Sequence, residues 1–220
     1  ALAPDGSLFF SDFYNDTSRR TNQVSGSIYR ITRKKGPKPV MPKIDFSTVP
    51  GLLNALKNPA VNVRSHAAAQ LVGKGEGATG QVLAFLREHE KEANLRSRAL
   101  WVLAQLGEKG RVEVSRYLDA EDEPEKVIVA YRALKHADPK GLLARASALA
   151  ESKFPSVRRE VAVSLKGASF FGCRKALIGL IDGYDGRNRY YLEALGVAFH
   201  GKEREVYEQL VRPLFPKPGQ

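Results

Sequence analysis

Apolar residues recur along most of this chain with the spacing of amphipathic helices. From Phe46 onward they fall at intervals of three and four residues, which is the period of one helical face. Superimposed on this period, a leucine returns at intervals of 32, 31, 31 and 30 residues. Self-similarity at such a spacing indicates a helical repeat. The recurring leucines are Leu71, Leu103, Leu134, Leu165 and Leu195.

Each repeat predicts a pair of helices. The second helix of each pair ends at the recurring leucine, and Pro59, Pro124 and Pro155 lie just upstream, where proline suits a helix start. The second helices are predicted in VRSHAAAQL, LRSRALWVL, KVIVAYRAL, VRREVAVSL and RNRYYLEAL. The first helices are predicted in STVPGLLNALKN, GQVLAFLREHE, RVEVSRYLDAE, GLLARASALAES and CRKALIGLIDGY, and EREVYEQLVRPLF opens a sixth pair.

Stacking of these helix pairs predicts the fold. One hairpin cannot bury both of its apolar stripes, whereas stacked neighbours bury them in a continuous core. We therefore expect a mainly α fold, an α-solenoid of five to six helix pairs over residues 46–220. Small residues at Ala67, Ala68, Ala99 and Ala162 should let adjacent helices approach closely, and a larger residue there would cost about 1–3 kcal/mol through overpacking.

The first 35 residues follow a different pattern. Two runs rich in aromatic and β-branched residues, opened by Gly-Ser turns at Gly6 and Gly26, predict two strands. The polar segment NDTSRRTNQVSG between them predicts a surface loop. Because a lone pair of strands is only marginally stable, it should pack on the following helices or on strands outside this chain. Residues 36–45 are basic and rich in proline, which predicts a semi-rigid linker.

Composition narrows the class of partner. The formal net charge of +11 favours acidic partners, which include nucleic acid, an anionic membrane surface and an acidic protein. No run of eighteen apolar residues occurs, so no membrane span is expected. The N-terminus lacks the pattern of a signal peptide, and the chain starts inside a strand pattern without methionine, which suggests a processed or excised piece. The single Cys173 excludes an internal disulfide framework.

Two parts of the sequence resemble known families. The repeats, with VR followed by a small residue, resemble the HEAT-like repeats of the phycobilisome-lyase type over residues 46–215. The segment DGSLFFSDFYND…SGSIYRI resembles the last blade of a β-propeller of the sugar or sorbosone dehydrogenase type. Together with the linker and YDGRNRYYLEALG, they resemble large membrane-bound dehydrogenase-type multidomain proteins of planctomycetes and verrucomicrobia, in which a c-type cytochrome module commonly follows.

This resemblance implies a role for the segment within a larger protein. It implies a non-catalytic scaffold or protein-interaction segment of an oxidoreductase-like protein, in the periplasm or another extracytoplasmic compartment, with the cytoplasm as the alternative. The haem attachment pattern C-x-x-C-H is absent around Cys173, so no covalent haem is expected in this chain. No other cofactor is predicted. The implied partner is a protein, or flanking modules of the same polypeptide, of acidic character.

Arginines concentrate on the predicted second helices, which line the concave face in such solenoids. Arg64, Arg96 and Arg158 share one repeated position, so they can also be structural groups that satisfy carbonyls or acidic side chains of neighbouring repeats. The other second-helix arginines are Arg98, Arg132, Arg159, Arg187 and Arg189. As candidate partner-contact residues we single out Arg96, Arg98, Arg158, Arg189 and Tyr191.

The stretch DGRNRYYLEALG, residues 185–196, illustrates the choice between scaffold and site. Asp185 and Gly186 predict a turn, and a helix is expected from Arg187, with Leu192 and Leu195 on its buried side. Of the two adjacent tyrosines, one ring should pack inward, while the other is available to a partner. The scaffold interpretation is favoured.

Nucleic-acid binding is the alternative function. Some HEAT-like solenoids of this size are DNA glycosylases that hold the duplex on a basic concave face, and phosphate neutralisation would use such a density of arginines. Those enzymes place aromatic residues and a carboxylate at the centre of the groove. Here Trp101 lies in RALWVLAQL beside helix-core positions, so we expect it in the core.

Residues that could carry catalysis or bind a metal are scattered. The four histidines include no pair at the i, i+4 spacing of a helical zinc site. The acidic run at residues 119–125 predicts a solvated turn, and Asp12 and Asp16 are expected to serve turns at strand ends. Neither a glycine-rich phosphate loop nor a nucleophile elbow is present. The sequence therefore predicts no catalytic or metal site.

Overall fold

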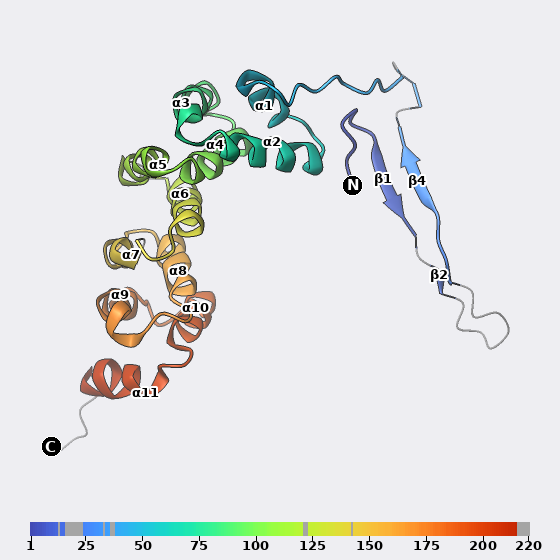
Figure 1. Ribbon diagram of the computed structural model, residues 1–220. Coiled ribbons are helices and arrows are strands. Elements are labelled where there is room, and N and C mark those ends of the chain that lie inside the picture. The colour runs from blue at the N-terminus through green and yellow to red at the C-terminus, as the bar shows by residue number, and fades with distance from the viewer. Residues whose placement is uncertain are drawn as a thin grey trace. The chain divides into compact units, whose positions relative to one another are not determined.

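The computed structural model describes residues 1–12, 14–15, 24–32, 34–35, 38–120, 123–141 and 143–214. Over these residues the chain is mainly helical, with short antiparallel strands near the N-terminus (Figure 1). It divides into two compact units, Ala1–Arg111 and Val112–Gln220, here called unit 1 and unit 2. None of the described helices is long and apolar enough to span a membrane.

The N-terminal strands of unit 1 pair as an antiparallel ribbon. Strand β1 (Leu8–Ser11) runs beside β4 (Ile28–Ile31). The two-residue strands β2 (Tyr14–Asn15) and β3 (Val24–Ser25) form a second ladder. The two predicted strands are confirmed, and the polar segment predicted as a loop contributes paired residues at both of its ends. Residues 16–23 of that segment lie outside the described residues.

One face of this ribbon is apolar and open. The register places Leu8 opposite Ile31 and Phe10 opposite Tyr29, so these four side chains share a face. All four are exposed by at least 41%, and the rings of Phe10 and Tyr29 stack with their centroids 4.9 Å apart. We call this surface the ribbon face. No described residue covers this face, so the expected packing of the strands on the following helices is not seen there.

Unit 1 also contains two helical hairpins. Within each hairpin the helices pack together, α1 on α2 and α3 on α4, and the hairpins stack because α1 contacts α3 and α2 contacts α4. The helices are α1 (Val49–Ala55), α2 (Val61–Gly73), α3 (Thr79–Glu88) and α4 (Ala93–Gln105), with a 3-10 turn η1 (Gly75–Ala78) before α3.

Unit 2 repeats the same packing. The second helix α8 contacts α6 on one side and α10 on the other, and the first helices α7 and α9 contact each other in the adjacent row (Figure 1). The helices are α6 (Pro124–Ala137), α7 (Leu143–Ala150), α8 (Pro155–Ser164), α9 (Phe170–Asp182), α10 (Arg189–Phe199) and α11 (Glu203–Val206), which continues as η2 (Tyr207–Val211) and η3 (Arg212–Leu214). Helix α5 (Glu108–Ala120) includes the boundary between the units.

The repeat period explains both the core and the helix ends. All five recurring leucines are exposed by 5% or less, which confirms the predicted solenoid-like stacking within each unit. Pro124 and Pro155 stand in the first turns of α6 and α8. Gly107 and Gly167 follow α4 and α8 with φ values of 101° and 78°, a left-handed conformation that glycine adopts without strain.

Leu192 departs from the expected buried stripe. Its side chain is 54% exposed, whereas Leu195 on the same helix is 4% exposed. At the corresponding position of α6, three residues before the recurring leucine, Tyr131 is buried and its hydroxyl lies 2.6 Å from Ser164 Oγ of the next second helix. Among the described residues no further second helix follows α10, so Leu192 has no such neighbour.

Truncation at these two leucines tests the stacked core. Leu195→Ala should lower the free energy of unfolding by about 2–5 kcal/mol, because it leaves a cavity between stacked helices. Leu192→Ala on the same helix is the matched control and should change the free energy by less than about 1 kcal/mol, because its side chain is already half in water. Urea unfolding of both variants measures the difference, and equal losses would contradict the stacking.

Candidate functional site

The repeated arginines hold the hairpins together from inside. Each stands near the start of a second helix, and its Nη1 donates to the backbone carbonyl six residues earlier, in the loop that joins the two helices of the hairpin. Such charge-assisted bonds satisfy carbonyls that the loop leaves without backbone donors. The structural interpretation of these arginines is therefore confirmed. The bonds run from Arg64 to Asn58 (2.9 Å), from Arg96 to Glu90 (2.7 Å) and from Arg158 to Ser152 (2.5 Å).

Arg158 is the centre of a larger polar cluster in unit 2. Its Nη2 donates to Gly183 O at 2.9 Å, and its Nε donates to the Tyr191 hydroxyl at 3.1 Å. That hydroxyl in turn donates to Leu180 O at 2.9 Å. A Cβ atom on Gly183 would lie 2.6 Å from Arg158 Nε, so a larger residue there would displace this guanidinium. The cluster joins the start of α8, the end of α9 and the first turn of α10.

Tyr191 is buried within this cluster. It is 1% exposed, and its ring lies 5.4 Å from the Arg158 guanidinium carbon, in cation–π contact. Burial raises the pKa of the Tyr191 hydroxyl above its ordinary value. The ring therefore presents no surface to a partner, contrary to its expected role as a contact residue. The other tyrosine of the pair, Tyr190, is 70% exposed, which confirms that one ring packs inward and one faces solvent.

The remaining two candidate contacts differ in accessibility. Arg98 is partly buried, and its Nη1 donates to Leu56 O, at the end of α1, at 2.6 Å. Burial, followed by the nearby charge of Arg64, lowers the pKa of Arg98. Arg189 has an 85% exposed side chain that pairs with Glu193 on the same helix at 2.9 Å. Of the five predicted contact residues, Arg189 is the one on open surface.

The stretch DGRNRYYLEALG forms the start of α10. The Asp185 carboxylate accepts from the backbone N–H groups of Arg187 and Asn188, at 2.9 and 3.0 Å. Asn188 caps the helix by accepting from Tyr191 N at 3.1 Å. The helix therefore begins at Arg189, two residues later than expected. The hydrogen bond from the backbone N–H of Asn188, followed by that from Arg187, lowers the pKa of the Asp185 carboxyl below its ordinary value.

Trp101 does not occupy the core position expected for it. It is 37% exposed on α4, between buried neighbours Leu100 and Val102. The core side of this helix passes through Ala99 and Leu103, each two residues away and therefore about 200° around the helix. Trp101 consequently lies on the solvent side of its helix.

Other residues considered for chemistry have structural roles. Cys173 is buried, its thiol donates to Ser169 O at 3.1 Å, and burial raises its pKa. Asp12, directly after β1, accepts from Ser27 N at 2.7 Å, so it bridges the two strands at a strand end and does not close a local turn. Asp16 and residues 121–122 lie outside the described residues. The described residues contain no group of three or more His, Cys, Asp or Glu side chains placed to hold a metal ion.

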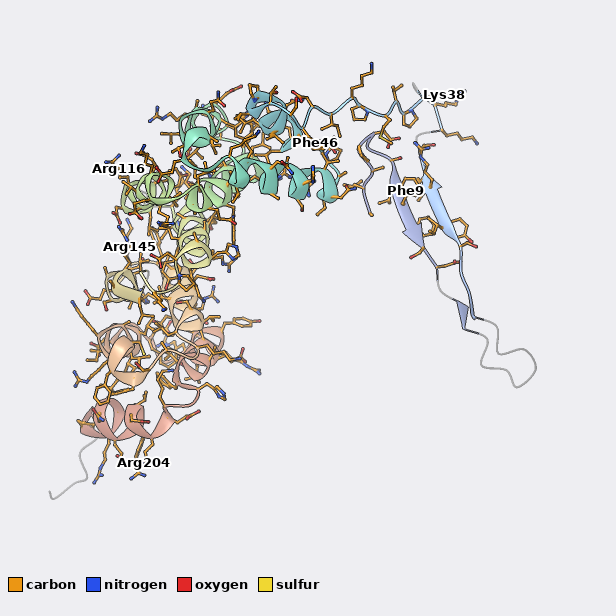
Figure 2. The ribbon with its side chains drawn as sticks, viewed as in Figure 1. Phe9, Lys38, Phe46, Arg116, Arg145 and Arg204 are labelled. Carbon is orange, nitrogen blue, oxygen red and sulfur yellow. The ribbon has the colours of Figure 1, made fainter. Side chains whose placement is uncertain are left out.

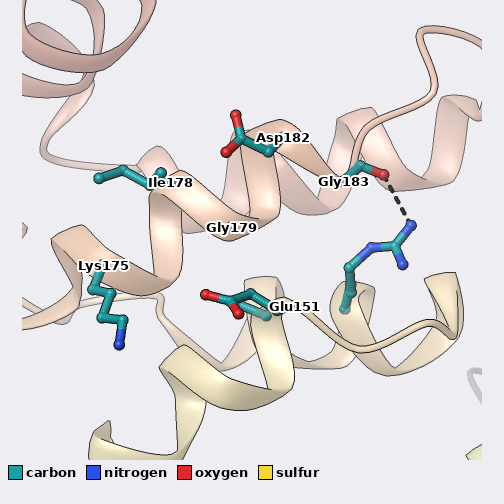
Figure 3. Close-up of a pocket in the computed structure, with 8 residues that line it drawn as sticks. Glu151, Lys175, Ile178, Gly179, Asp182 and Gly183 are labelled. Carbon is teal, nitrogen blue, oxygen red and sulfur yellow. Dashed lines mark hydrogen bonds between the residues drawn. The ribbon is translucent and has the colours of Figure 1, made fainter.

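A pocket that the sequence analysis missed lies between α7, α8 and α9. It has a volume of about 420 Å³, and its lining includes two acidic residues, Glu151 and Asp182, and two basic residues, Lys175 and Arg158 (Figure 3). Close packing of α7 on α9 shapes it, since a Cβ on Gly179 would lie 3.1 Å from Glu151 Cγ. The one signal in the sequence is the pair of glycines four residues apart on the predicted first helix, in IGLIDG.

Comparison with known proteins gives no family for this chain. No protein-family model matches it, and no curated protein matches it. The function is therefore inferred from the arrangement of its own residues.

Replacement of Arg158 tests its structural role. Arg158→Ala should lower the free energy of unfolding by about 2–3 kcal/mol, because Ser152 O, Gly183 O and the Tyr191 hydroxyl lose a charged donor. Arg189→Ala, which removes an exposed arginine, should change it by less than about 0.5 kcal/mol. Thermal and urea unfolding give both values. An Arg158→Ala variant as stable as the native chain would contradict the structural role of Arg158.

Acid titration tests the turn before α10. Because the folded-state pKa of Asp185 is lowered, its contribution to stability is present above the unfolded pKa and disappears as the pH falls through the folded pKa. Asp185→Ala should therefore be less stable than the native chain at pH 7, and the difference should shrink in acid. Asp185→Asn keeps an acceptor without the charge, so its deficit should be smaller at pH 7. Urea unfolding at several pH values measures this, and a pH-independent deficit would speak against it.

Proposed function

We propose that this chain is a non-catalytic helical-repeat scaffold that positions flanking modules or binds a protein partner, within a larger oxidoreductase-like, cytochrome-linked protein outside the cytoplasm. One observation carries the scaffold role: the arginines at the repeated position, together with Arg98, are turned onto backbone carbonyls. In the proposed scaffold these arginine side chains stabilise the fold and do not bind a substrate.

The ribbon face supports a place in a larger protein. Two paired strands with four exposed apolar side chains on one face are unstable in water unless another surface covers that face. In our proposal this cover belongs to a β domain of the propeller type, and the ribbon is its junction with the helical repeats. The helices then hold that domain at a set distance from the next module.

The charge of the chain supports an acidic protein as partner. The formal net charge is +11, and complementary charge mainly accelerates association and selects among partners. Exposed cations on the helices are therefore expected to steer an acidic surface toward the scaffold.

Nucleic-acid binding is the second candidate, and one observation favours it. Tyr190 is 70% exposed beside Arg189, whose side chain is 85% exposed, and Trp101 is also on a solvent side. Exposed aromatic rings next to arginines can stack on bases and neutralise phosphates. A base-excision protein of the DNA glycosylase type would use such a surface.

Gel-shift titration with duplex DNA at two ionic strengths separates the two functions. A scaffold of this charge should show only non-specific affinity, with Kd about 10⁻⁴–10⁻⁶ M at physiological salt. Tyr190→Ala should leave that affinity unchanged within about twofold, because non-specific binding depends on phosphate contacts. A Kd near 10⁻⁸ M that is lost in Tyr190→Ala and Arg189→Glu would overturn the scaffold in favour of specific nucleic-acid binding.

A further inference from the structure

Helix α9 carries a second, exposed stripe opposite its buried one. Phe171, Arg174, Lys175 and Ile178 fall at positions i, i+3, i+4 and i+7, so they lie on one side of the helix. All four are exposed, and Phe171 reaches 82%, the highest value among the exposed large apolar side chains. We call these four residues the α9 stripe. An apolar residue at each end and two cations between them make a surface with mixed character.

The two cations of the stripe differ from other arginines on the same row of helices. Figure 2 labels three of these arginines, Arg116, Arg145 and Arg204. Each forms an ion pair with a carboxylate, at 2.6, 2.7 and 3.1 Å respectively. Within the described part of the chain, neither Arg174 nor Lys175 forms an ion pair. Two adjacent positive charges are thus available to an external carboxylate.

The α9 stripe borders the pocket between α7 and α9. Lys175 and Ile178 belong to both the stripe and the pocket lining. Figure 3 shows Lys175 on α9 and Glu151 directly after α7 at two sides of this pocket. Asp182 adds a second carboxylate to the lining, and neither it nor Glu151 forms an ion pair within the described residues. Stripe and pocket together form a continuous surface with cations, carboxylates and apolar side chains.

Shape and charge decide which kind of partner fits. A bilayer surface cannot enter a pocket, and nucleic acid carries a phosphate at every nucleotide, so it could not keep its negative charge away from Glu151 and Asp182. A peptide segment can place one side chain in the pocket and others along the stripe. Its carboxylates would meet Arg174 and Lys175, while its apolar side chains would cover the exposed ring of Phe171.

We propose that the α9 stripe and its pocket are the docking site for an acidic peptide segment of a partner protein, one that alternates carboxylates with apolar side chains. The proposal rests on the proposed scaffold function and names the surface and the chemistry of the partner. Carboxylates of the segment pair with Arg174 and Lys175, and apolar side chains pack on Phe171 and Ile178.

Binding of a defined probe tests this site on the full chain. The probe is a fluorescein-labelled twelve-residue peptide of alternating leucine and glutamate, compared with the same peptide carrying glutamine in place of glutamate. Fluorescence anisotropy should show the glutamate peptide binding at least about tenfold more tightly, because only it supplies charged acceptors for Arg174 and Lys175. Phe171→Ser should weaken binding of the glutamate peptide about three- to tenfold, because the leucines of the peptide lose the exposed ring on which they pack.

A matched pair of charge reversals separates the site from net charge. Arg174→Glu combined with Lys175→Glu should weaken binding of the glutamate peptide at least about tenfold. Arg116→Glu combined with Arg204→Glu changes the net charge equally, at cations that are already paired, and should weaken it less than about threefold. The residues replaced in these two variants and in Phe171→Ser are all solvent-exposed. Circular dichroism checks that each of the three variants remains folded.

Several results would overturn the docking site. Equal binding of the glutamate and glutamine peptides would do so, as would equal losses in the two charge-reversal variants. Phosphatidylserine vesicles and duplex DNA serve as further probes, and binding of either that depends on the α9 stripe without binding of the peptide would assign the stripe to lipid or nucleic acid. If these results contradict the docking site but DNA affinity stays in the non-specific range, the proposed scaffold function is unaffected.

Discussion

Burial of an apolar stripe between neighbouring hairpins is the interaction on which the rest of this structure depends. A two-helix hairpin has apolar residues on more sides than its own partner helix can cover, so it is stable only beside another hairpin. In each unit the recurring leucines lie within that contact, exposed by 5% or less.

The arginine-to-carbonyl bonds follow directly from this packing. A loop pressed between two stacked helices leaves carbonyl groups without backbone donors, and an unsatisfied buried carbonyl is costly. Arginine reaches back six residues to the loop, and at Arg158 its planar fork serves three acceptors at once. Lysine, with a single ammonium group, could not serve the same three directions. The positive charge of the second helices is therefore partly internal.

What remains outside the fold defines how this protein can act. The ribbon face and the α9 stripe each combine exposed apolar side chains with a regular element, a strand pair in one case and a helix in the other. In the proposed function both surfaces contact other polypeptides.

The period of apolar residues and the proline and glycine positions were sufficient to predict the helix pairs, the buried leucines and the strand pair, because these depend on local spacing. The roles of individual side chains were not predictable in this way. Whether Arg158 faces a partner or a loop carbonyl depends on the path of the chain six residues earlier, and whether Tyr190 or Tyr191 is buried depends on a one-residue rotation about α10. Leu192 and the pocket beside Glu151 likewise depend on which helix lies next to them. Local periodicity specifies which elements form, whereas the exposure and bonding of each side chain are set by neighbours that are distant along the chain and meet only when the hairpins stack.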